Sequence, residues 1–446
     1  MVDRGCPVRW PPEPPIDHPV NPTPRPGTAR SALRHRRFRL IFLGVSLSNV
    51  GTWMQNFILP AYLDARTGSA ALVGLLVFAQ LGPQLVLSIP SGVLADRVDR
   101  TRLVLAMQST MMALSFVLAA LAATDRALWT LFVVQLAIGV ANTIQAPAFN
   151  ASLPTLVPRE DLPGAVSLNS AMINGSRIAG PALAAVLASL GLATWQLFAV
   201  NGLSYVFLMV PLVRLGLPSV TGGNDRRGWR ALTVGVTLAR RRGVLSRLLV
   251  SMAVFSLVSL PYIGLFPSVA RLNLGLDAVS VSYKVLYVVW GAGAFLGALS
   301  VGTVFAGSER SRLIVRGLVG FAVFLGLFAL VSSYIPALMI AAGLGFVYFM
   351  VATTMVTELQ HNLRDDERAS VMPLWFMSFG GMVPVGNLLA GPIMDAVGAR
   401  WVLAVGAAAA LGVARWVDLR RLPASSFLDD AQNPPSSPDS PAARHL

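Results

Sequence analysis

Residues 92–102 read GVLADRVDRTR, and residues 302–312, which lie 210 positions further along the chain, read GTVFAGSERSR. Each stretch lies between two long apolar segments, and a glycine, an acidic residue and two arginines occupy matching positions in both. Such self-similarity at a fixed spacing indicates an internal duplication. We therefore expect two related halves, each built around one copy of this loop.

The composition of the chain indicates an integral membrane protein. Of its 446 residues, 54% are hydrophobic and only 13% are charged, whereas a soluble domain has about 25% charged residues. A helix needs about 20 apolar residues to cross the hydrocarbon core. The sequence predicts twelve such helices, at 38–63, 70–95, 102–123, 128–150, 167–190, 194–213, 247–270, 281–306, 313–332, 335–358, 370–392 and 400–417.

The basic residues predict the orientation in the membrane. If both termini are cytoplasmic, 25 Arg and Lys residues near the spans lie on the cytoplasmic side, and five lie opposite: Arg66, Arg126, Arg271, Lys284 and Arg400. This asymmetry follows the positive-inside rule for an even number of helices. Basic residues in the predicted cytoplasmic loops and tails account for the net charge of +14, and they are interpreted as determinants of membrane orientation. No nucleic-acid partner is therefore expected.

The pattern divides the chain into five parts of an all-α, multi-pass protein of the cell inner membrane. Two pseudo-symmetric six-helix bundles, at 34–213 and 247–421, are joined by a basic cytoplasmic linker at 214–246. The tails at 1–33 and 422–446 are expected to be disordered in the cytoplasm, because they are rich in proline and polar residues and lack the apolar stretch of a signal peptide.

The sequence offers no metal or cofactor site. Cys6 is the only cysteine and the four histidines fall in predicted tails and loops, so neither a disulfide nor a Cys/His metal cluster is expected. Lys284 is the only lysine and follows no glycine-rich phosphate loop, which argues against an ATPase. We expect no enzyme, cofactor or metal. We expect a monomer whose partners are lipid, a small-molecule substrate and, as a candidate coupling ion, protons.

The loop at 92–102 resembles the signature of the major facilitator superfamily between its second and third helices, Gly-x-x-x-Asp-Arg-x-Gly-Arg-Arg. The resemblance implies a loop that holds one conformation of the two halves together. Gly92 would allow close helix approach, and Asp96 would face a helix N-terminus, where the dipole favours a carboxylate. Asp99 replaces the usual glycine, a variant of the branch that includes enterobactin exporters and macrolide-efflux-like proteins. The conformational motif comprises Gly92, Asp96, Arg97, Asp99, Arg100 and Arg102.

Other stretches resemble the same branch, and the resemblance extends over about residues 34–420. They are Gly68-Ser69-Ala70, residues 153–158 and residues 177–182. Gly180 and Pro181 resemble the fifth-helix element of family exporters and are assigned as a hinge, although Ala184 stands where a glycine is usual. The fourth helix lacks the arginine that many proton-coupled members carry.

Arg177 lies inside the predicted fifth helix, about 15 Å from its cytoplasmic end at 1.5 Å per residue. An unpaired arginine at mid-bilayer costs at least about 2.5–3.5 kcal/mol, so its side chain should face the bundle interior or water. Two roles are open: contact with a substrate or gating partner, or a structural bond to backbone groups.

Polar and aromatic side chains are predicted to line the substrate path. An amide inside the membrane needs a partner, so it should point to another helix or to a cavity. The first half supplies most of the amides and the second half supplies many aromatic rings, which would suit a bulky amphipathic solute. Packing within the bundle is the alternative for each of them. With Arg177, the candidates are Asn49, Trp53, Asn56, Gln80, Gln84, Gln135, Asn142, Gln145, Tyr287, Trp290 and Trp375.

Helix breakers predict interruptions of three helices, which neighbouring helices can tolerate by satisfying the freed backbone groups. The breakers are Gly51 and Pro60 in the first helix, Gly180-Pro181 in the fifth and Gly391-Pro392 in the eleventh.

Acidic residues are scarce inside the predicted spans. Asp64, at the outer end of the first helix, is expected to pair with Arg66, and Glu358 lies at the cytoplasmic end of the tenth helix. Neither position identifies a proton carrier.

Three functions fit this pattern. The first is a secondary active transporter that exports a small amphipathic molecule, such as a drug or siderophore, by alternating access driven by the proton gradient. The second is an uptake permease of the same fold, and the third is a non-transporting membrane scaffold or sensor. The loop at 92–102 and Arg177 favour transport, because a scaffold needs neither.

Overall fold

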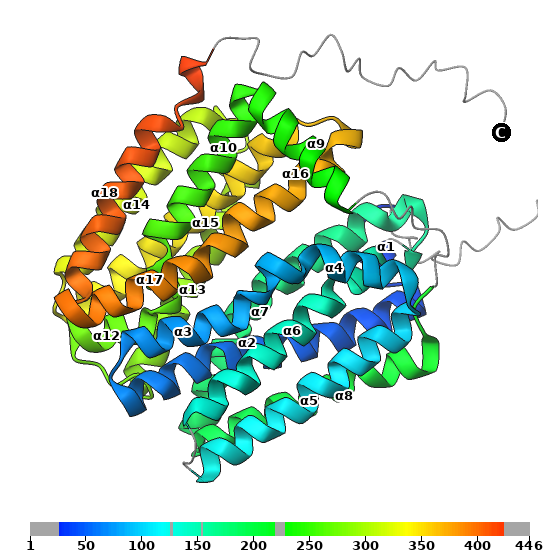
Figure 1. The fold of residues 1–446 in the computed structure, drawn as a ribbon, viewed down its shortest axis with the longest axis horizontal. Coiled ribbons are helices and arrows are strands. Elements are labelled where there is room, and N and C mark those ends of the chain that lie inside the picture. The colour runs from blue at the N-terminus through cyan, green and yellow to red at the C-terminus, as the bar shows by residue number, and fades with distance from the viewer. Residues whose placement is uncertain (1–25, 125–127, 153–154, 219–227, 423–446) are drawn as a thin grey trace, which may run out of the picture.

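The computed structural model describes residues 26–124, 128–152, 155–218 and 228–422. Over these ranges the chain forms α-helices with short 3-10 and π-helical segments, and it contains no β-strand. The helices gather into two bundles, which Figure 1 shows from blue to blue-green for the first half and from green to red for the second. The predicted all-α fold of two helical halves is confirmed.

The first half begins with a single short turn of helix and continues with six membrane segments, the second of which is divided between two helices. Its elements are α1 (Ala29–Ala32), α2 (Arg36–Thr67), α3 (Ala70–Leu81), α4 (Pro83–Arg97), α5 (Arg100–Thr124), α6 (Leu128–Ser152), η2 (Arg159–Asp161), α7 (Leu162–Ser189) and α8 (Thr194–Leu215).

The second half follows α9 (Gly228–Arg241), and two of its six segments contain a π-helical turn. Its elements are α10 (Gly243–Val254), η3 (Phe255–Ser259), α11 (Pro261–Gly264), α12 (Phe266–Leu274), α13 (Val281–Gly302), α14 (Arg310–Leu330), α15 (Tyr334–His361), α16 (Asp365–Phe376), η4 (Met377–Gly381), α17 (Met382–Val397), α18 (Ala399–Trp416) and η5 (Leu419–Arg421).

Twelve segments of the described chain match the twelve predicted spans. Ten helices are long and apolar enough to cross a membrane, and a bent pair, Thr233–Arg241 with Gly243–Ser259, raises this number to eleven. The twelfth is α2, which is not among these apolar helices but whose 32 residues exceed the length that a span needs. In the bent pair the angle is 112°, so α9 lies across the end of the bundle and α10 to α12 form the seventh segment.

The helices bend at other places than predicted. The predicted interruptions are wrong, because α2, α7 and α17 run unbroken through their glycines and prolines. A proline removes one backbone donor, which a helix inside a bundle can tolerate. The observed breaks are the junction of Gly82 and Pro83 between α3 and α4, and the π-helical segments η3 and η4.

The two halves meet along α3 with α17 and along α7 with α13, and Figure 1 shows α3 beside α17. Glycines allow the first contact: a Cβ on Gly74 would lie 2.3 Å from the backbone oxygen of Asn387. A Cβ on Gly391 would lie 2.5 Å from the backbone oxygen of Ala70. Small residues let membrane helices approach closely, so the backbones of α3 and α17 are in direct contact along this seam.

The segments outside the bundles are partly structured. Residues 26–33 fall in the predicted N-terminal tail, yet α1 packs against α7, and Asp161 accepts hydrogen bonds from the backbone N–H of Gly27 at 3.0 Å and pairs with His35 at 2.7 Å. Residues 1–25 and 423–446 lie outside the described residues. In the predicted linker, α9 packs on α16, and Arg242 forms a bidentate pair with Glu367 at 2.7 and 2.9 Å.

Candidate functional site: a central arginine and a gate between the halves

The bundle has two ends. We call the end with the α2–α3 and α17–α18 turns the distal end, and the end with α1, α9 and the last described residues the proximal end (Figure 1). The loop at 92–102 and its repeat at 302–312 both lie at the proximal end.

Asp64 joins the two halves at the distal end. Its side chain is fully buried at the end of α2, and it accepts hydrogen bonds from Arg271 Nε at 2.8 Å and Nη2 at 3.1 Å. Arg271, on α12 of the second half, also donates to the backbone oxygen of Gly68 at 2.8 Å. The predicted pair with Arg66 is wrong, because Arg66 donates to the Tyr62 hydroxyl at 3.0 Å. A bidentate pair is the strongest arrangement of these two groups.

Asp395, near the end of α17, forms a second distal link. Its carboxylate accepts hydrogen bonds from the Ser69 hydroxyl at 2.8 Å and from the backbone N–H groups of Ala70 and Ala71 at 2.7 and 2.9 Å. The first N–H groups of α3 have no partner within the helix, and the helix dipole favours a negative charge there. A carboxylate of the second half thus caps a helix of the first half.

The acidic residues of the motif at 92–102, at the proximal end, bond within the first half and not to the described residues of the second half. Asp96 pairs with Arg100 on its own half at 3.6 Å, and its side chain is 48% exposed. The expected contact of Asp96 with a helix N-terminus is therefore not made in this conformation. Asp99 instead caps α5 by accepting from the backbone N–H of Arg102 at 2.7 Å. A Cβ on Gly92 would meet no heavy atom within 4 Å, so the expected close approach at Gly92 is wrong in this conformation.

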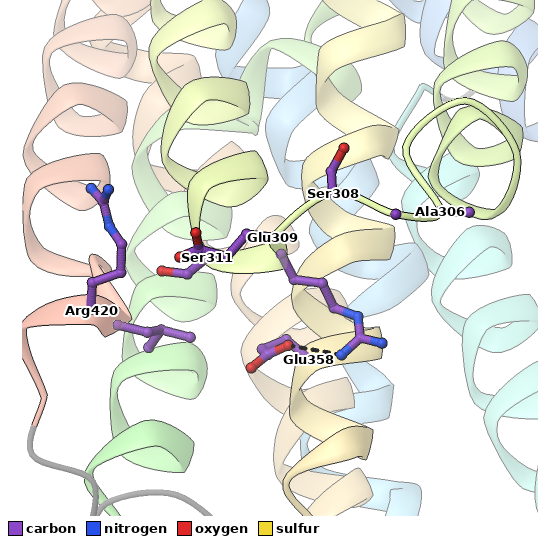
Figure 2. A pocket seen from close by; sticks show the side chains of 9 residues that line it. Ala306, Ser308, Glu309, Ser311, Glu358 and Arg420 are labelled. Atoms are coloured by element: carbon purple, nitrogen blue, oxygen red, sulfur yellow. Dashed lines mark hydrogen bonds and ion pairs between the residues drawn. The ribbon is translucent and has the colours of Figure 1, made fainter.

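The repeat of the motif lines a pocket of about 560 Å³ at the proximal end of the second half (Figure 2). Arg310 donates to Glu358 of α15 at 3.4 Å, which is the dashed contact in Figure 2, and Glu309 pairs with Arg312 at 2.6 Å. The pocket contains both signs of charge, and all of its lining residues belong to the second half. Its lining residues are Ala306, Gly307, Ser308, Glu309, Arg310, Ser311, Glu358, Leu419 and Arg420.

Arg177 lies near the middle of α7, where the two halves meet. Its guanidinium carbon lies 5.0 Å from the ring centroid of Trp53 on α2 and 5.3 Å from that of Phe349 on α15. Phe349 belongs to the second half, so Arg177 is held between rings of both halves. Gly180 brings α7 to this place, because a Cβ there would lie 2.6 Å from the backbone nitrogen of Met54.

Arg177 makes no hydrogen bond or ion pair with any described residue. Its Nε atom is buried without a partner. The side chain as a whole is half-buried, as are those of Trp53 and Phe349. A cation–π contact contributes about 0.5–2 kcal/mol, but rings do not accept the in-plane hydrogen bonds that the five N–H donors of a guanidinium can form. The site therefore holds a positive charge whose hydrogen-bonding groups are not used by the described residues.

A chain of aromatic rings extends from this arginine across the interface. Tyr348 is adjacent to Phe349, with ring centroids 4.6 Å apart, and stacks on Trp290 at 6.1 Å. Tyr287 lies 5.3 Å from Trp290 and 4.7 Å from Phe57 of the first half. The predicted candidates Tyr287 and Trp290 therefore belong to one cluster with Arg177.

Several of the predicted path residues bond or stack with neighbours inside one half, and for others the structure gives only their burial. Trp290 donates to the Tyr262 hydroxyl at 3.1 Å, and Trp375 is buried and stacks on Phe379 at 6.4 Å. Gln145 bonds to Gln108 at 3.0 Å and to Asn142 at 3.3 Å, which ties α5 to α6. Asn49, Asn56, Gln80 and Gln84 are half-buried, while Gln135 is buried with an unpaired Oε1.

The sequence analysis missed a buried polar network inside the first half. Gln55 Oε1 accepts hydrogen bonds from the Asn201 amide at 2.7 Å and from the Ser115 hydroxyl at 2.9 Å. These residues lie on α2, α8 and α5, and all are buried. The network satisfies polar groups that would otherwise be costly in the membrane.

The sequence also contains a pattern around Asp395 that the sequence analysis did not use. We call the two distal links, Asp64 with Arg271 and Asp395 with the start of α3, the distal gate. Gly391, Asp395, Gly398 and Arg400 have the spacing Gly-x-x-x-Asp-x-x-Gly-x-Arg, which matches the family signature given above at four positions. The proximal loop of this chain shares only the Gly-x-x-x-Asp part of that spacing, at Gly92 and Asp96. Of the two aspartates, Asp395 bridges the halves in this conformation, and Asp96 pairs within its own half.

Known proteins with related sequences are exporters. A family model described as a transmembrane secretion effector matches residues 27–441. Macrolide efflux protein A of Streptococcus pyogenes is 23% identical over 386 residues, which cover 83% of this chain and 92% of that protein. Enterobactin exporter EntS of Shigella boydii is 24% identical over 345 residues, which cover 76% of this chain and 81% of that protein.

Solved structures show the same fold at low identity. A bacterial homologue of the lysosomal transporter Spinster superposes with a TM-score of 0.65 at 13% identity, covering 89% of this chain and 98% of that one. The nucleoside transporter NupG superposes with a TM-score of 0.67 at 12% identity, covering 87% of this chain and 100% of that one. Both are transporters with helical bundles of this kind.

The chain belongs to the transmembrane secretion effector family of the major facilitator superfamily. It is a multi-pass protein of the plasma membrane that carries a small molecule, and it is not an enzyme.

Proposed function

We propose that the protein exports a small amphipathic molecule from the cytoplasm by alternating access, driven by the proton gradient. The observation that carries this proposal is the position of Arg177. It lies at mid-helix between the halves, and its two ring contacts come from different halves. A group placed in this way changes its surroundings when the halves rock against each other, which is what a transport site requires.

The distal contacts are suited to open and close. The links of Asp64 with Arg271 and of Asp395 with the start of α3 are polar, so water can replace them when the halves separate. The excess of basic residues in the proximal loops supports an orientation with the distal end outside the cell. The conformation is then closed to the outside, which is the state that receives a molecule from the cytoplasm.

The related proteins support the outward direction. Two of them are a macrolide efflux protein and an enterobactin exporter, and the family is described as a secretion effector. NupG shares the fold and is a nucleoside transporter, so the fold by itself is compatible with uptake. Direction is therefore the property to be measured.

The test uses membrane vesicles of both orientations from cells that express the chain and lack other drug exporters. A panel of fluorescent dyes, antibiotics and siderophores is offered with and without a proton uncoupler. Export predicts uncoupler-sensitive accumulation in inside-out vesicles, and an uptake permease predicts accumulation in right-side-out vesicles. A chain lacking residues 1–25 and 423–446 should still transport. Absence of transport by the full-length chain in vesicles of either orientation would favour the scaffold or sensor.

A further inference from the structure

We propose that Arg177 binds an anionic group of the transported molecule, and that the preferred ligands are aromatic anions such as aryl carboxylates. This inference rests on the proposed function and names the substrate class of the same site. The guanidinium of Arg177, which has no hydrogen-bond partner among the described residues, lies beside the rings of Trp53 and Phe349 where the two halves meet.

The helices around Arg177 supply no counterion. α2, α7, α13 and α15 together carry two acidic residues, Asp64 and Glu358. Asp64 is bonded to Arg271 at the distal end, and Glu358 is paired with Arg310 at the proximal end. Neither acid is available to Arg177, so the positive charge at the centre of the bundle is not neutralised by these helices.

The free edges of the guanidinium determine what can bind. Its N–H groups form a planar fork that matches a carboxylate or phosphate with two parallel hydrogen bonds. The rings of Trp53 and Phe349 contact the cation but accept none of these bonds. An anionic ligand would therefore supply both a counter-charge and acceptors for the Nη groups, which are not among the buried atoms of this side chain.

The aromatic rings around Arg177 favour a ligand whose uncharged part is planar and apolar. Trp53 and Phe349 are half-buried beside Arg177, and Tyr287 is half-buried in the adjoining cluster. Aromatic faces of this kind bind planar apolar groups by stacking and edge contacts. A cationic ligand would face the uncompensated charge of Arg177 in a setting of low dielectric, where like charges repel more strongly than in water.

The inference can be tested with three probes of one size that differ in charge. Anthracene-9-carboxylate is anionic, 9-anthracenemethanol is neutral and 9-aminomethylanthracene is cationic. Binding is measured by equilibrium dialysis with the full chain in nanodiscs of phosphatidylcholine, which excludes anionic lipid as the source of any signal. Transport of the same probes is measured separately in vesicles.

The variants are Arg177→Gln, Arg177→Lys and the control Arg316→Gln. Arg316 is an exposed arginine on α14, so its replacement removes the same charge from a different place. We expect wild-type protein to bind the carboxylate at least tenfold more tightly than the alcohol, and more tightly still than the amine. Arg177→Gln should abolish this preference while alcohol binding is retained, Arg177→Lys should restore part of it, and the control should match wild type.

Equal binding of the three probes by wild-type protein would overturn the inference, as would an unchanged carboxylate preference in Arg177→Gln. Retained binding of the alcohol shows that a variant is folded, so a loss of carboxylate binding alone is specific. Anion binding without any transport would contradict the proposed function and leave the inference standing. Transport that prefers the amine would contradict the inference and leave the proposed function standing.

Discussion

Arg271 of the second half holds Asp64 of the first half through two hydrogen bonds, of 2.8 and 3.1 Å, although 207 positions separate them in the chain. The pair links the two halves at the distal end, whereas Arg177, at the centre of the interface, has no such partner among the residues that the structure describes. The two arginines therefore have different expected roles. Arg271 stabilises the conformation in which the distal ends of the halves are in contact, and Arg177 is expected to bind an anionic group of the transported molecule.

Replacing either member of the distal pair should favour opening of the distal end. Arg271→Gln leaves the buried Asp64 carboxylate without its counterion, which costs up to about 3–5 kcal/mol. Asp64→Asn leaves Arg271 partly exposed and still bonded to the Gly68 oxygen, so its effect should be smaller. A cysteine introduced at Asn56, in a chain with Cys6 replaced by serine, should then react at least tenfold faster with an impermeant thiol reagent added outside cells.

The double variant and Arg66→Gln are the controls for that experiment. Removing both partners should open the distal end no further than one replacement does, because the two groups act as one pair. Arg66 is exposed at the same end, and its replacement should leave the labelling rate near that of the parent. Additive effects of the two single replacements would show that the pair does not act as a unit.

Asp395→Ala should weaken the second distal link. The start of α3 loses its carboxylate cap, which costs about 0.5–2 kcal/mol and corresponds to at most about thirtyfold in an opening equilibrium. The same cysteine labelling measures it. Asp277→Ala is the matched control, because Asp277 accepts from the N–H of Val279 within its own half. Equal labelling of the two variants would argue against a role of Asp395 in closure.

Replacing two different glycines by valine should have different effects on the stability of the protein. Gly74→Val would force the α3–α17 seam apart, since a Cβ at this place lies 2.3 Å from a backbone oxygen, and overpacking of this kind costs about 1–3 kcal/mol. Gly92→Val meets open space in this conformation. We expect a lower unfolding temperature for Gly74→Val in detergent and little change for Gly92→Val. A reversed order would contradict the described seam.

Replacing the two acidic residues of the proximal motif should have different effects, one on stability and the other on transport. Asp99→Ala removes the cap of α5 and should lower stability by about 0.5–2 kcal/mol. Asp96→Ala removes an exposed side chain with one contact at 3.6 Å and should leave the unfolding temperature nearly unchanged. If the motif holds the other conformation, as its resemblance to the family signature implies, Asp96→Ala should still reduce the transport rate. Normal transport by this variant would remove Asp96 from the mechanism.

The fold could be predicted from the sequence because apolar length and basic loops are local properties. The twelve predicted spans match helical segments of the structure, and the first of them, 38–63, lies inside α2. Bends were predicted at the wrong places, since Gly180 and Gly391 serve close helix contacts. Whether a glycine bends a helix or admits a neighbour depends on the neighbour, which the local sequence does not contain.

The candidate site was predicted in part. Arg177 and Trp53 were identified from position and residue type, and the structure brings them together. Phe349 and Arg271 were not chosen, because their importance comes from contacts with the other half. The spacing around Asp395 that matches the family signature could have identified the distal gate, since a glycine, an acid and an arginine recur there in the same order.

The most direct test of alternating access is a cross-link across the distal end. Ser69 and Asp395 are in hydrogen-bond contact at 2.8 Å, so cysteines at both places can be joined by a short reducible thiol cross-linker in the Cys6→Ser background. If the halves must separate there, cross-linking should stop transport, reduction should restore it, and either single-cysteine variant should be insensitive to the reagent. Undiminished transport by the fully cross-linked protein would contradict the account.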